Sequence, residues 1–145
     1  MVYYIHQTSK WMDRRQEMAD TEKITINLSV VDLGQVDLLV EQGLYSSRSD
    51  LIRTAIRNQL AAHGDIVQQT VVRKSLALGV LLYDHRDLEE SLAKGEMLDI
   101  HIVGMVILAK DITPELARQT IRSLQVYGVL QASPEVKDAL ADRIG

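Results

Sequence analysis

Short stretches of strand-like and helix-like hydrophobic pattern follow one another from residue 22 onward. In residues 23–29, apolar Ile24, Ile26 and Leu28 alternate with polar residues, which is the period of a half-buried β-strand. No second strand lies next to it, because the sequence passes directly into a helical pattern. The unpaired backbone therefore predicts a partner strand from elsewhere, most simply the same segment of a second chain.

Two amphipathic helices are predicted after this strand. The first begins at the capping sequence 29–32 and ends at Gly43, which can adopt the positive φ of a helix terminus. The second begins at a similar capping sequence, 47–50. A strand and two helices of this size cannot bury their apolar sides alone, so this unit also predicts a dimer. The apolar stripes are Leu33, Val36 and Val40 in the first helix and Leu51, Ile52, Ala55, Ile56 and Leu60 in the second.

A threefold repeat occupies residues 64–145. Strand patterns that begin at Ser75, Asp99 and Ser123 are 24 residues apart, and each contains a glycine near its middle. Strand-plus-helix repeats of this length are typical of solenoids in which like strands stack in parallel. We therefore expect an α+β protein whose C-terminal part is a stack of three strand-helix repeats, with a compact sensor fold of the ACT type as the alternative. The repeat helices are expected at residues 87–93, 114–121 and 134–140.

The domain organisation predicted from these patterns has three parts. Residues 1–21 have no sustained periodicity and are expected to be a flexible N-terminal arm. Residues 22–63 form the strand-helix-helix domain, and residues 64–145 form the repeat domain. Three strands leave open sheet edges, so the repeat domain is expected to join dimers into tetramers or longer assemblies.

Composition narrows the chemistry of the chain. It has no cysteine and a formal net charge of −4, and no apolar run approaches the ~20 residues of a membrane helix. We expect a cytoplasmic protein with no membrane contact. Its histidines are scattered and no catalytic motif stands out, so neither an enzyme activity, a metal site nor a cofactor is expected. His85 is the best single candidate for a ligand or base, but its surroundings favour a helix start.

Three consecutive parts of the chain form a familiar pattern: residues 23–29, a short helix, and the segment Gly43-Leu44-Tyr45-Ser46-Ser47-Arg48-Ser49-Asp50-Leu51-Ile52-Arg53. Together they resemble the ribbon-helix-helix DNA-binding family of CopG, Arc, MetJ and NikR type. The resemblance covers residues 22–63 and implies that the ribbon enters the major groove of double-stranded DNA. It assigns base contacts to Lys23, Thr25 and Asn27, whose side chains suit guanine, thymine and adenine edges. It assigns phosphate contacts to Ser47, Arg48 and Ser49 at a helix N-terminus. The nickel site of NikR-like regulators is not carried over, because this chain has no cysteine.

Three functions are compatible with this resemblance. The preferred one is a sequence-specific transcriptional regulator, a repressor, that acts as a dimer or higher oligomer. The alternative is an antitoxin, which would repress its own operon and mask a toxin with its C-terminal part. A third is a scaffolding protein that polymerises through its repeats and uses DNA as an anchor. The foldable appearance of residues 74–145 favours the regulator.

Overall fold

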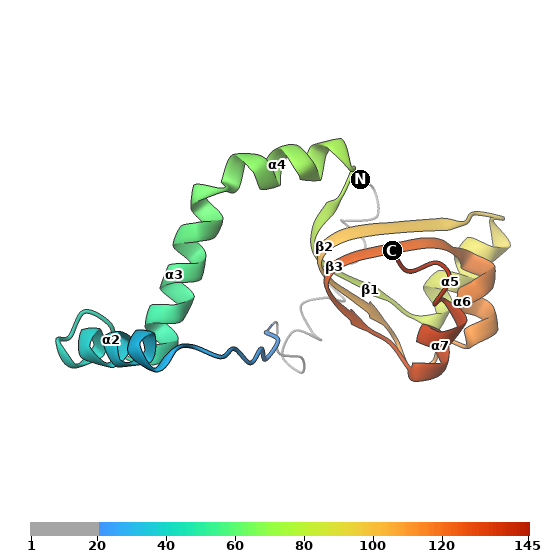
Figure 1. Cartoon of the computed structure of the whole chain (residues 1–145). Coiled ribbons are helices and arrows are strands. Elements are labelled where there is room, and N and C mark those ends of the chain that lie inside the picture. The colour runs from blue at the N-terminus through green and yellow to red at the C-terminus, as the bar shows by residue number, and fades with distance from the viewer. Residues whose placement is uncertain (1–20) are drawn as a thin grey trace. The chain divides into compact units, whose positions relative to one another are not determined.

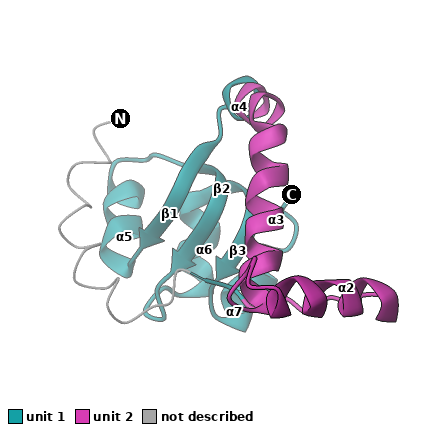
Figure 2. Cartoon of the chain, turned by 90° about the vertical axis from the view of Figure 1, so that its left-hand side faces the viewer, with its two compact units in different colours: residues 1–22, 71–145 teal, residues 23–70 magenta. Residues whose placement is uncertain are grey.

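The computed structural model describes residues 21–145, which contain six helices and three strands (Figure 1). The predicted arm at 1–21 therefore lies outside the described residues, except for Thr21. The chain divides into two compact units, coloured separately in Figure 2. The N-terminal unit is Lys23–Thr70, and the C-terminal unit comprises, among the described residues, Val71–Gly145 with Thr21 and Glu22.

The N-terminal unit is helical after residue 29. It contains α2 (Val30–Glu41), α3 (Arg48–Ala62) and most of α4 (Gly64–Arg73). The start of α2 is confirmed, because the Ser29 hydroxyl accepts a hydrogen bond from the backbone N–H of Asp32 at 3.1 Å. The predicted end is confirmed too. Gly43, with φ of 81°, donates to the Val40 carbonyl, and Leu44 donates to the Leu39 carbonyl, which together terminate the helix.

The second predicted helix stops before Gly64. His63 caps α3 with a non-helical backbone conformation, and α4 begins at the glycine itself. None of the side chains of residues 23–70 is buried, although the predicted stripe residues Leu33, Val36 and Val40 are half-buried. Several large apolar side chains of the unit are exposed to solvent, among them Leu38, Ile56, Leu60 and Ile66. The unit therefore has apolar faces but no core of its own.

The C-terminal unit alternates strands and helices. Its elements are β1 (Ala77–Tyr83), α5 (His85–Ala93), β2 (Leu98–Leu108), α6 (Pro114–Thr120), β3 (Ile121–Gln131) and α7 (Pro134–Ala139). The strands form a parallel sheet in the order β1-β2-β3, and the three helices lie on one side of it (Figure 1). This agrees with the predicted α+β class and strand-helix repeats, whereas an all-parallel sheet does not support the ACT-type alternative.

A column of glycines sets the register of the sheet and corrects one step of the predicted repeat. Gly79, Gly104 and Gly128 lie opposite one another, all with φ between 128° and 140°. A Cβ atom on Gly104 would lie only 1.9 Å from the Gly79 carbonyl oxygen, so the close approach of the backbones requires glycine. Ile102 pairs with Ala77, a spacing of 102−77=25, so the first predicted spacing of 24 was wrong by one residue.

The corrected register changes which residue of β1 would lie beside His101. The spacing of 24 between the first two repeats would set Ala77 beside His101, but Ala77 pairs with Ile102 instead. The second predicted spacing is confirmed, because His101 pairs with Gln125. A slip of one residue matters because it moves a side chain to the opposite face of a sheet.

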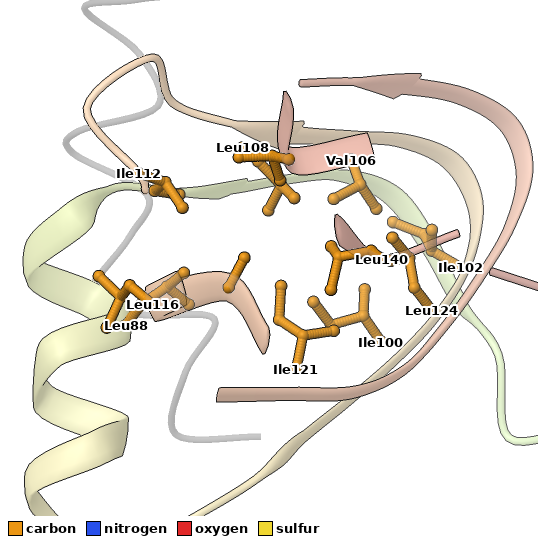
Figure 3. Packing of buried hydrophobic residues seen from close by; sticks show 12 residues of the cluster. Leu88, Ile100, Ile102, Val106, Leu108, Ile112, Leu116, Ile121, Leu124 and Leu140 are labelled. Atoms are coloured by element: carbon orange, nitrogen blue, oxygen red, sulfur yellow. The ribbon is translucent and has the colours of Figure 1, made fainter. Parts of the chain in front are cut away.

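The core lies between the sheet and its helices. Figure 3 shows the side chains of the buried cluster converging from both layers. The helix α5 begins at His85, two residues before the predicted start, because Asp84 and Asp87 form a reciprocal capping box at 3.0 and 2.9 Å. The cluster consists of Leu88, Ile100, Ile102, Val106, Leu108, Ile112, Leu116, Ala117, Ile121, Leu124, Val136 and Leu140.

Candidate nucleic-acid interface

The segment that precedes α2 presents polar and apolar side chains to solvent alike. Lys23, Thr25 and Asn27 are exposed, and the exposed fractions of Ile24 and Ile26 are 68% and 51%. Within residues 21–145, no backbone hydrogen bond involves residues 23–28, and no strand forms there. The predicted strand requires a partner that residues 21–145 do not supply, so the ribbon stays a prediction.

The N-terminus of α3 offers two unused backbone donors. The Ser47 hydroxyl accepts a hydrogen bond from the N–H of Asp50 at 3.1 Å, as its predicted capping role requires. The N–H groups of Arg48 and Ser49 have no acceptor in the described part of the chain. Together with the helix dipole, two such donors favour a bound anion.

The carboxylate of Asp50 holds the loop before α3. Its Oδ2 atom accepts from the Ser46 backbone N–H at 3.0 Å and from the Ser46 hydroxyl at 3.1 Å. The prediction of a capping box is therefore half correct: Ser47 caps the helix, while the acid bonds to Ser46. The negative charge of Asp50 lies beside the predicted phosphate site, and its Oδ2 atom already accepts these two hydrogen bonds.

The side chain of Arg48 is engaged by a residue that the sequence analysis did not find. Its Nε and Nη2 atoms donate to the two carboxylate oxygens of Asp37 at 2.6 and 2.7 Å. These hydrogen bonds lower the pKa of Asp37 and raise the pKa of Arg48 from their usual values. One signal was available: α2 contains no lysine or arginine, so any basic partner of Asp37 would come from another element.

The predicted contacts thus fall into two groups. Ser47, Arg48 and Ser49 are consecutive at the start of α3, where the helix terminus brings their polar groups together. Lys23, Thr25 and Asn27 lie in the separate segment before α2, and no hydrogen bond or ion pair joins their side chains to other residues among 21–145. All six side chains are exposed, as contact with a macromolecule requires.

A second polar cluster lies on the sheet of the C-terminal unit. The Ser123 hydroxyl donates to Asp99 at 2.6 Å and lies 3.0 Å from Nε2 of His101. Arg122 also donates to Asp99, and these hydrogen bonds lower the pKa of Asp99. In a hydrolytic triad the histidine joins the serine to the acid, whereas here the serine contacts the acid directly. These hydrogen bonds link the neighbouring strands β2 and β3.

His85, the candidate ligand or base, has a partner for one ring nitrogen, while its Nδ1 atom is buried without a hydrogen-bond partner among the described residues. Nε2 of His85 lies 2.9 Å from a carboxylate oxygen of Glu89, one turn along α5. Across the described range, no group of three or more histidine, aspartate or glutamate side chains is arranged to hold a metal ion. The helices of this range are also too short or too polar to cross a membrane.

Comparison with known proteins identifies the family. No curated protein and no solved structure is detectably similar to the chain. Residues 19–137, which cover most of both units, match the model of the Ribbon-Helix-Helix transcriptional regulator family. This match confirms the resemblance inferred from residues 22–63 and extends it into the repeat domain. The chain belongs to the ribbon-helix-helix transcriptional regulator family.

Proposed function

We propose that this chain is a sequence-specific DNA-binding repressor whose residues 23–29 pair with those of a second copy. The resulting two-stranded ribbon lies in the major groove, which is wide enough for such an element. Its outer face presents Lys23, Thr25 and Asn27 to base edges. The N-terminus of α3 binds a phosphate on each side through Ser47, Arg48 and Ser49.

One observation carries this proposal: residues 23–70 contain no buried side chain. A unit with so many apolar positions and no core needs a partner to be stable. The ribbon segment has the same need, because its backbone is unpaired in the described chain while Ile24, Ile26 and Leu28 are exposed. A second copy meets both needs at once, since pairing the segments places their apolar faces against the helices.

The repeat domain is proposed to assemble these dimers further. It has a core of its own, which favours a stable assembly module over an antitoxin segment that folds only on its toxin. The C-terminal residues Arg143 and Gly145 pair with β3 at Leu124, but from 126 to 131 the outer edge of β3 has no backbone partner in the described chain. Joining dimers there would let one assembly bind several operators with increased avidity.

The test starts with a selection of bound genomic fragments, followed by titration of the enriched duplex. We expect replacement of Lys23, Thr25 or Asn27 by alanine to cost about 1–3 kcal/mol of binding free energy on that duplex. The same variants should bind DNA of unrelated sequence with nearly unchanged affinity. Gln69→Ala, in an exposed part of α4, is the matched control. Unchanged affinity of all three variants for the enriched duplex, or a monomeric protein, would reject the proposal.

A further inference from the structure

The Arg48 guanidinium uses only one of its two paired donor edges. Nε and Nη2 are bound to Asp37, while Nη1 has no acceptor among residues 21–145. A guanidinium carries five N–H donors in a rigid plane, so the edge formed by Nη1 and Nη2 retains donors that can bind a second anion. The Arg48 side chain is 57% exposed, which leaves that edge open to a ligand of the size of DNA.

The partner of Arg48 is well placed to hold it. Asp37 belongs to α2 and Arg48 is the first residue of α3, so the ion pair crosses the loop between the two helices. Arginine loses much rotamer freedom when it makes a single directed contact, and a bidentate carboxylate removes that freedom in advance. A lysine ammonium has three donors but no rigid planar edge, so a carboxylate would not hold it in one orientation.

We infer that Asp37 is a positioning residue for DNA binding: it orients Arg48 through one edge so that the other edge meets a backbone phosphate. The inference rests on the proposed function, since it concerns the phosphate site at the start of α3. The Asp37 carboxylate also repels the phosphate. Both members of the pair are exposed, so salt and solvent screen that repulsion, whereas the orientation of the guanidinium is retained.

The experiment measures binding of the full-length protein to the duplex enriched by selection, between about 50 and 200 mM KCl. Arg48→Ala should weaken binding about tenfold and reduce the salt slope by about 2 per dimer, because two phosphate contacts are lost. Asp37→Ala should weaken binding about fivefold, although it removes negative charge. Asp37→Asn keeps one of the two acceptor oxygens, so it should weaken binding less than Asp37→Ala does.

The control is Glu41→Ala, which makes the same change of charge on the same helix at a residue with no side-chain partner in the described chain. It should leave binding unchanged or slightly tighter. The double variant Asp37→Ala/Arg48→Ala should bind like Arg48→Ala alone, because Asp37 acts through Arg48. A purely structural role of the pair would lower the melting temperature of Asp37→Ala without changing the salt slope, and this would reject the inference.

Two other outcomes separate this inference from the proposed function. Tighter binding by Asp37→Ala than by Glu41→Ala would show that the carboxylate competes with phosphate, and it would overturn the positioning role while leaving the DNA-binding proposal intact. Unchanged binding by Asp37→Ala to a duplex for which Asn27→Ala loses affinity would likewise overturn the positioning role and leave the DNA-binding proposal intact. Failure of the wild type to bind any duplex would reject the proposed function and this inference together.

Discussion

The two units of this chain both contain helices with many apolar side chains, yet only one of them has a core. The C-terminal unit places a sheet against three helices and buries a cluster of twelve apolar side chains. The N-terminal unit has longer helices, yet no residue between 23 and 70 is buried. A single layer of helices cannot enclose its apolar faces, whereas two layers can. The C-terminal unit therefore has a core within one chain, whereas the proposed dimer would supply the second layer that the N-terminal unit lacks.

The largest effect is expected from Gly104→Ala. The new Cβ would overlap the Gly79 carbonyl and occupy a backbone conformation with φ of 140°, so strain and overlap together should cost about 4 kcal/mol of unfolding free energy. Gly34→Ala is the control, because its Cβ would meet no atom within 4 Å and it lies within α2. That substitution should stabilise the helix by about 0.5–1 kcal/mol.

Chemical denaturation followed by circular dichroism measures both changes. If Gly104→Ala left the C-terminal unit as stable as the wild type, the glycine column would not be what fixes the register of the sheet.

Replacing an isoleucine by alanine should destabilise both units, but the loss of stability should depend on protein concentration in the N-terminal unit only. Ile102 is completely buried, so Ile102→Ala should cost about 3 kcal/mol in the unfolding of the C-terminal unit at every protein concentration. Ile26 is 51% exposed in the single chain, so Ile26→Ala should weaken only the dimer.

Thermal melts over a wide range of protein concentration, with mass measured by light scattering, distinguish these responses. A loss for Ile26→Ala that does not depend on concentration would mean that its apolar face packs within the chain, contrary to the proposed ribbon.

The smallest effect concerns acid stability. Hydrogen bonds from Arg122 and Ser123 hold the pKa of Asp99 below its usual value, so the folded chain keeps this carboxylate ionised where the unfolded chain binds a proton. The resulting stability is present above about pH 4 and is lost as the pH falls toward the lowered pKa of the folded state. Asp99→Asn should therefore lower the melting temperature slightly at pH 7, and the difference should shrink below about pH 4.

Asp138→Asn is the comparison for this measurement, because the Asp138 side chain is exposed and has no hydrogen bond or ion pair with residues 21–145. An equal pH dependence for both variants would show that the Asp99 cluster contributes no stability of its own.

Local signals in the sequence were sufficient for much of the fold. Ser29 and Ser47 cap the two predicted helices, and Gly43 ends the first, because capping depends on residues within one turn. Alternating apolar residues gave the three strands of the repeat domain. The family match supports the ribbon-helix-helix assignment made from residues 22–63.

Most of the features that the sequence did not predict correctly are contacts between residues that lie far apart along the chain. The first repeat spacing was off by one because sequence similarity does not report backbone approach, which is what aligns Gly79 with Gly104. The pairing of Arg48 with Asp37 joins residues eleven positions apart in different helices, where no helical spacing rule applies. The start of α5 was placed late because Asp84 caps it from the end of a strand.

The glycine column also restricts which strands can extend the sheet. Each added strand has brought its own α-hydrogen against the carbonyl of the preceding glycine, and a Cβ on Gly128 would lie 2.0 Å from the Gly104 oxygen. A further parallel strand beyond β3 faces the same steric demand at the level of Gly128. A strand that continued the column there would need glycine at that level, because the close backbone approach leaves no room for a Cβ atom.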